Sequence, residues 1–223
     1  MTLSYVLHLA AYSDGVLYVL ALLLLVALAV TLDRFWYLRR TILRGELVVR
    51  LVGGRDRLDA TELEQLARDA GALPEAALLA TARDHLGTDR DGLADRMDET
   101  ILLLAPRIDR GLWILDTIVT LAPLLGLFGT IVGMFHAFSV LASPGHAPTA
   151  VTAGVADALV ATASGIFIAM LGLAAFNTLS NRVRLVLLQL DTVKLMVMNR
   201  TVRVAIAPGP RERAVLHAVG AGA

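Results

Sequence analysis

Long stretches without charge constrain the fold of this chain more than any other feature of its sequence. Residues 16–32 contain no charged side chain, and residues 111–181 contain only two, Asp116 and Asp157. A helix that spans the hydrocarbon core of a membrane needs about 20 mainly apolar residues. The first stretch supplies one such helix, and the second is long enough for two helices joined by a short loop. The sequence therefore predicts an all-α integral membrane protein with three transmembrane helices and long cytoplasmic helical extensions.

The overall composition excludes several other classes of protein. The chain is 57% hydrophobic and 18% charged, its 20 Lys and Arg residues equal its 20 Asp and Glu residues, and it has no cysteine. This hydrophobicity excludes a disordered chain, and the net charge of zero excludes a globally basic nucleic-acid-binding protein. The lack of cysteine excludes a disulfide scaffold and a thiolate metal site.

Basic residues predict the orientation of the three helices. Arg39 and Arg40 follow the first apolar stretch, Arg182 and Arg184 follow the last, and the loop at 143–149 has no basic residue. Lys and Arg are in excess in the loops on the cytoplasmic side of a membrane. We therefore expect the N-terminus and this loop to be outside and the C-terminus to be inside.

Changes in charge density divide the chain into successive segments. Residues 34–110 contain 13 Arg and 14 acidic residues, which is typical of a solvated insert between membrane helices. We expect a periplasmic N-terminus at 1–14, a transmembrane helix at 15–38, a cytoplasmic helical insert at 39–110, a second transmembrane helix with a cytoplasmic extension at 111–142, a periplasmic loop at 143–149, a third transmembrane helix at 150–178, a cytoplasmic helix at 179–207, and a disordered tail at 208–223.

Within the insert, capping and breaking residues predict where helices begin and end. Thr61 and Glu64 have the spacing of a capping box, and Asp59 is a second candidate for the N-cap. The remaining expected boundaries are a helix end at Gly71, a helix start at Pro74, a third helix from about Asp91, and a bend or interruption near Pro106.

Apolar residues after the last membrane stretch recur at alternating intervals of three and four. This period predicts a helix with a coiled-coil or bundle seam. The seam packs either on the protein's own insert or against another subunit, and the sequence leaves both alternatives open. Its residues are Phe176, Leu179, Val183, Val186, Leu190, Val193 and Val197.

Small residues line one face of each of the last two membrane stretches. Small residues let helices approach closely in a membrane, so these faces are predicted to pack helices and to contact a partner. The residues are Gly126, Gly129 and Gly133 in the second stretch, and Gly154, Ala158 and Gly165 in the third.

Polar residues within these stretches are the candidate functional residues. A charged Asp at the centre of a membrane helix costs about 2.5–3.5 kcal/mol, so it usually faces a partner or a watery cavity. We expect Asp157 to mark an ion path, with Thr162 near the other border of the same small-residue face. Alternatively, Asp157 is a protonated or interfacial residue that only caps or bonds a neighbour, and Thr130 bonds its own helix. Catalytic and nucleotide-binding motifs are absent from the sequence, so we expect no enzyme activity, cofactor or metal.

Two sequences in these stretches carry a resemblance to a known family. Residues 122–133 read APLLGLFGTIVG, and residues 154–165 read GVADALVATASG. With them the chain resembles the MotA/TolQ/ExbB proton-channel family, in its ExbB and TolQ branch. The resemblance implies that Thr130 and Thr162 line the pore, and that Asp157 occupies a position where the family usually has Glu.

The same resemblance implies a function and partners. A homopentamer of this subunit would surround the transmembrane helices of a dimeric ExbD-like or TolR-like partner, whose membrane-embedded Asp carries protons. The leading hypothesis is a proton-channel or stator subunit of an inner-membrane motor in a Gram-negative-type bacterium. It would couple proton-motive force to a TonB-type or TolA-type envelope protein, for outer-membrane import or envelope integrity. The alternative is a non-conducting scaffold that holds partner membrane proteins.

Overall fold

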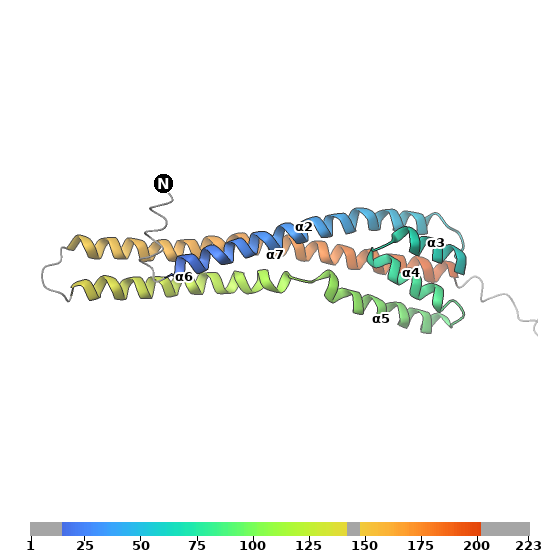
Figure 1. Ribbon diagram of the computed structural model, residues 1–223. Coiled ribbons are helices and arrows are strands. Elements are labelled where there is room, and N and C mark those ends of the chain that lie inside the picture. The colour runs from blue at the N-terminus through green and yellow to red at the C-terminus, as the bar shows by residue number, and fades with distance from the viewer. Residues whose placement is uncertain (1–14, 142–147, 202–223) are drawn as a thin grey trace, which may run out of the picture. The chain divides into compact units, whose positions relative to one another are not determined.

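The computed structural model describes residues 15–141 and 148–201, which form six α-helices and contain no strand (Figure 1). The helices are α2 at Val16–Gly53, α3 at Ala60–Ala70, α4 at Pro74–Asp84, α5 at Arg90–Ile108, α6 at Leu112–Leu141 and α7 at Pro148–Thr201. The expected N-terminus at 1–14, most of the loop at 143–149 and the tail at 208–223 lie outside the described residues.

Three of these helices are long and apolar enough to cross a membrane. The apolar spans lie within Val16–Gly53 of α2, Leu112–Ser139 of α6 and Gly154–Thr201 of α7. Large side chains on them, such as Leu25 and Phe135, are 64% and 73% exposed. Soluble monomers rarely expose large apolar patches, whereas lipid covers such a surface in a membrane. The predicted all-α class and its three membrane-length helices are therefore confirmed.

The chain divides into two compact units. Among the described residues, the membrane unit comprises those up to Leu38 together with those from Asp109 to Arg182, and it contains the three apolar spans. The insert unit comprises Arg39–Ile108 together with the described residues from Val183 to Thr201. Helices α2 and α7 contribute residues to both units.

The core of the insert unit is built by the end of α2, by α3, α4 and α5, and by the end of α7. The α7 residues of this unit in the predicted seam are buried within the chain, as the first alternative for the seam requires. Burying one Leu or Val side chain fully contributes about 1.5–3 kcal/mol, so this core is a major source of stability. Its buried residues include Leu63, Leu66, Leu78, Leu79 and Met97 from the short helices, and Val183, Val186, Leu190, Val193 and Val197 from α7.

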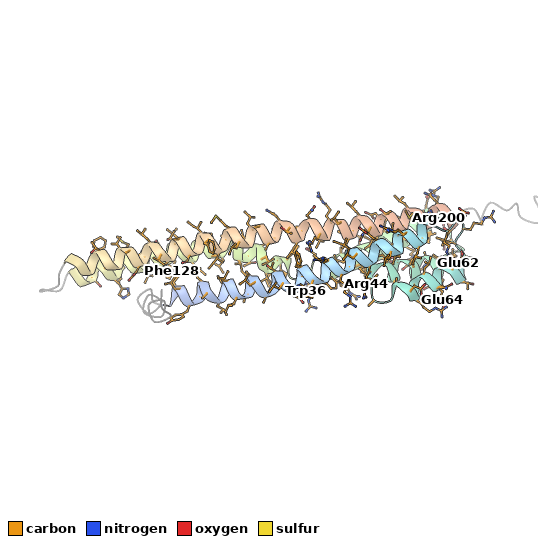
Figure 2. The ribbon with its side chains drawn as sticks, turned by 90° about the horizontal axis from the view of Figure 1, so that it is seen from above. Trp36, Arg44, Glu62, Glu64, Phe128 and Arg200 are labelled. Atoms are coloured by element: carbon orange, nitrogen blue, oxygen red, sulfur yellow. The ribbon has the colours of Figure 1, made fainter. Side chains whose placement is uncertain are left out.

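Arg200, near the end of α7, donates hydrogen bonds to carbonyl groups at and just after the end of α2. Its Nε donates to the Arg55 carbonyl at 2.5 Å, and its Nη2 donates to the Gly53 carbonyl at 3.1 Å. The last carbonyls of a helix have no partner within the helix, so the bond to Gly53, the last residue of α2, satisfies a group that would otherwise need water. Figure 2 labels Arg200 on α7.

The start of α3 decides between the two candidate caps, because Asp59 and not Thr61 is the N-cap. Asp59 Oδ1 accepts from the Glu62 backbone N–H at 2.7 Å, and Glu62 Oε2 accepts from the Asp59 N–H at 3.3 Å. Arg55 Nη1 holds the other Glu62 oxygen at 2.7 Å. This ion pair favours the earlier of the two possible capping boxes, and Asp is also the stronger N-cap residue.

The other helix boundaries follow mostly from backbone chemistry. Gly71, with φ 62°, ends α3, and Pro74 opens α4, so both predictions are confirmed. The bend or interruption predicted near Pro106 lies later in the chain. Helix α5 continues through Pro106 to Ile108, and the break before α6 contains Gly111, whose φ of 86° favours glycine.

Replacing Asp59 by Ala should weaken the first turn of α3. The Glu62 N–H loses its acceptor, and loss of an N-cap costs about 1 kcal/mol, so the amides of that turn should exchange with solvent deuterium about fivefold faster. Thr61→Ala is the matched control and should leave their exchange rates unchanged. Equal acceleration in both variants would contradict the assignment of the cap.

Candidate functional site

Helices α6 and α7 lie in backbone contact within the membrane unit. A Cβ added at Gly165 of α7 would be 2.5 Å from the Ala122 carbonyl oxygen of α6. A Cβ added at Gly126 of α6 would be 2.9 Å from the Ala161 carbonyl oxygen of α7. The two helices approach this closely because neither glycine has a side chain, as is common in membrane proteins.

Small residues extend this contact toward the ends of α6 and α7 that border the 143–149 loop. A Cβ at Gly129 would be 2.8 Å from Ala161 Cβ, one at Gly133 would be 2.8 Å from Ala158 Cβ, and one at Gly154 would be 2.9 Å from Ala137 Cβ. All the small residues singled out in the sequence therefore lie at the interface of α6 with α7. A contact of these faces with a partner protein stays a prediction.

Thr162 is tied to this close approach. Its Oγ1 donates to the Gly126 carbonyl oxygen at 2.9 Å, which joins α7 to α6 across the glycine contact. A side chain at position 126 would push the helices apart and break this bond. The glycines thus determine where the Thr162 hydroxyl points.

Thr130 bonds within its own helix, as the packing alternative expects. Its Oγ1 donates to the Leu127 carbonyl oxygen at 2.6 Å. A hydroxyl has one hydrogen to donate and two lone pairs that accept. Because Thr130 and Thr162 both donate to backbone carbonyls, each keeps only acceptor capacity for a further ligand.

Asp157 lies on α7 next to Ala158, which packs against Gly133. Its side chain is half-buried, and it has no hydrogen-bond or ion-pair partner within the described ranges 15–141 and 148–201. Five residues separate it from Thr162, about 140° around a helix. The two side chains therefore address different neighbours, and the bond to a neighbour that the alternative for Asp157 requires is not formed within those ranges.

A cation–π contact that the sequence did not predict joins α2 to α7. Arg182 Cζ lies 3.9 Å from the centre of the Phe35 ring, and Arg182 Nη1 donates to the Phe35 carbonyl at 3.4 Å. Trp36 beside it is 75% exposed (Figure 2), whereas Phe35 is half-buried. The sequence signal for it was only that Arg182 follows the last apolar stretch.

Comparison with known proteins agrees with this architecture. Residues 70–192 match the family described as the MotA/TolQ/ExbB proton channel family. The chain belongs to this family. The match includes all of the α6–α7 contact described above, from Ala122 to Gly165.

Individual members of the family are similar to the chain at moderate identity. Over 171 residues it is 32% identical to the biopolymer transport protein ExbB-like 1 of Synechocystis sp., covering 74% of this chain and 66% of that protein. Over 169 residues it is 34% identical to the Tol-Pal system protein TolQ of Haemophilus influenzae, covering 68% and 64%. Over 88 residues it is 38% identical to the biopolymer transport protein ExbB of Neisseria gonorrhoeae, covering 39% and 40%. In each match the chain spans less than two thirds of the relative's length.

Replacing Gly165 by Ala should destabilise the membrane unit. The new methyl group would meet the Ala122 backbone, which cannot turn away as a side chain can, and overpacking of this kind costs about 1–3 kcal/mol. The melting temperature of the purified protein in detergent should fall by several degrees. Gly172→Ala on the same helix is the control, because its Cβ would meet only a movable Val119 methyl at 3.1 Å. A fall of equal size in the control would argue against the backbone contact.

Proposed function

We propose that this protein is the channel-forming subunit of a proton-driven motor in the inner membrane of a Gram-negative-type bacterium. Its membership of the proton channel family and its three membrane-length helices support this function. The strongest support comes from Thr130 and Thr162. Because each hydroxyl already donates to a backbone carbonyl, it can only accept a further hydrogen bond, which suits a protonated carrier. In this arrangement the N-terminus and the 143–149 loop face the periplasm, and the C-terminus faces the cytoplasm.

The threonines are proposed to recognise the protonated form of a carboxyl group. In the proposed assembly, a homopentamer surrounds an ExbD-like or TolR-like dimer whose membrane Asp carries the proton. A protonated carboxyl donates a hydrogen bond, which Thr130 or Thr162 can accept while its own hydrogen stays on a backbone carbonyl. An ionised carboxylate needs donors, which these hydroxyls supply only by giving up those bonds. The pore therefore favours the carrier while it holds its proton.

Asp157 is proposed to receive protons before they reach the level of Thr162. It lies five residues closer to the 143–149 loop, a rise of about 7.5 Å along the helix. Its carboxyl is half-buried and has no partner in the described part of the chain, so it is available to a proton entering from that side. Each proton supplies about 2.3 kcal/mol per 100 mV of membrane potential, so several must act in sequence to do mechanical work on a TonB-type or TolA-type client.

A non-conducting scaffold is the second candidate function. The observation in its favour is that both threonine hydroxyls are already bonded to the backbone, as plain helix packing would have them. Proton flux separates the two candidates, because a scaffold carries none under any imposed potential.

Removing the Thr162 hydroxyl should reduce proton flux and leave assembly intact. Thr162→Val keeps the shape of the side chain but cannot accept a hydrogen bond, and an unmet polar group costs about 1–3 kcal/mol, so flux should fall roughly 5- to 150-fold. The measurement is proton uptake by vesicles that contain this protein and its single-span partner. Thr162→Ser is the matched control and should retain most of the flux, and native mass spectrometry should show the same assembly for all forms. Undiminished flux in the Val variant would exclude Thr162 from the path.

Neutralising Asp157 should also reduce proton flux. Asp157→Asn removes the titratable group at nearly constant size, whereas Asp157→Glu keeps it and adds one methylene. In the same vesicles we expect the Asn variant to lose most of its flux and the Glu variant to retain it. Equal flux in the Asn variant and the unmodified protein would show that Asp157 has only a structural role.

A further inference from the structure

The insert unit contains a fully buried carboxyl group. Glu75 follows Pro74 in the first turn of α4, and its side chain has no exposed surface. Neither carboxyl oxygen has a hydrogen-bond partner within the described part of the chain. Glutamate is almost never buried in this way unless it is paired, so the state of this group needs an explanation.

The amide of Gln189 on α7 presents a second unpaired acceptor to the same place. Gln189 Nε2 donates to the Ile42 carbonyl at 3.2 Å, which fixes the orientation of the amide. Its Oε1 is therefore the free end, and it too is buried without a donor. A Cβ on Gly45 of α2 would contact Glu75 Oε1 and would lie 2.9 Å from Gln189 Oε1. The two acceptors thus converge on one point of the α2 backbone, where glycine leaves room for them.

Neighbouring charges do not account for an ionised Glu75. Arg44 and Glu46 beside Gly45 on α2 are exposed, as is Asp191 on α7. The cations that the structure shows paired on the surrounding helices contact other acids. These pairs are Arg68 with Glu64 on α3, Arg83 with Asp84 on α4, Arg96 with Glu99 on α5, and Lys194 of α7 with Asp98.

Burial raises the pKa of Glu75 above its ordinary value of 4.5 because the charged form loses its hydration. Its own backbone N–H, at the start of α4, offsets part of this rise in pKa without reaching hydrogen-bond geometry. A protonated Glu75 supplies the donor that Gln189 Oε1 lacks, because a carboxylic acid donates from one oxygen while the other remains an acceptor.

We propose that Glu75 holds a proton in the folded insert unit and donates a hydrogen bond to Gln189 Oε1, so that the contact of α4 with α7 depends on that proton. This proton site is separate from the proposed transmembrane path and does not rest on the protein being a channel. It gives the insert unit a response to the pH of its own compartment.

The sign of the response follows from the direction of the pKa shift. The folded unit holds the proton more tightly than the open one, so the contact is fully stabilised below pH 4.5 and is weakened as the pH rises toward the folded pKa. Between these two values the equilibrium constant for opening should rise tenfold per pH unit. Above the folded pKa it should no longer change.

Infrared spectroscopy of the full-length protein in detergent tests the proton directly. As the pH rises above 4.5, carboxyls of ordinary pKa lose their protons first, so a protonated-carboxyl stretch that persists to higher pH reports a group with a raised pKa. We expect one such band that moves on glutamate-specific ¹³C labelling, which separates it from Asp157. It should be lost in Glu75→Gln and retained in the control Glu64→Gln, whose side chain is 45% exposed. Absence of the band from the unmodified protein, or its persistence in Glu75→Gln, would overturn the proposal. A cation held by an ionised Glu75 would give the first of these results.

Hydrogen exchange of the α4 amides tests the consequence. Glu75→Gln supplies a permanent neutral donor to Gln189, so it should match the unmodified protein at low pH and exchange more slowly than it at higher pH. The ratio of the two protection factors should change by up to tenfold per pH unit, in the sense that the unmodified protein opens more easily as pH rises. A ratio independent of pH across the range in which the infrared band disappears would overturn the proposed coupling.

Discussion

The close approach of α6 and α7 is the constraint on which the membrane unit depends. In lipid the hydrophobic effect does not drive helices together, so their association relies on van der Waals contact and hydrogen bonds. Gly126 and Gly165 allow the two backbones to touch. This contact brings the Gly126 carbonyl within 2.9 Å of Thr162 Oγ1, which the side chain of a larger residue would prevent. The glycines therefore set the short distance between the helices, and Thr162 supplies the hydrogen-bonding group.

The residues on the packed face of helix α7 differ between the two units. In the membrane unit its packed face is made of Gly154, Ala158 and Gly165, because close contact must replace the hydrophobic effect. In the insert unit the packed face carries Val186 and Leu190, which are fully buried, because water rewards the removal of apolar area. The helical period is the same in both halves, and the size of the residues on the packed face differs with the solvent.

The sequence predicts features that depend on local chemistry and misses those that depend on distant partners. The three apolar spans, the helix end at Gly71 and the helix start at Pro74 follow from hydropathy and backbone conformation. The N-cap at Asp59 was one of two possible choices, and an ion pair with Arg55 separates them. The contact of Arg182 with Phe35 joins residues 147 positions apart, so the sequence around either residue gives no sign of it.

The carboxyl groups of Asp157 and Glu75 show most clearly that burial cannot be predicted from the local sequence. Asp157 is conspicuous in the sequence because its neighbours are apolar, yet the structure leaves it half-buried. Glu75 is one of 14 acids in a charged region, where a solvated surface is the natural interpretation, yet it is fully buried. A residue's environment is set by the helices that cover it, and here those helices are α2 and α7, distant in sequence from α4. Burial without a donor is what makes protonation the favourable state, and burial becomes visible only when the three helices are brought together.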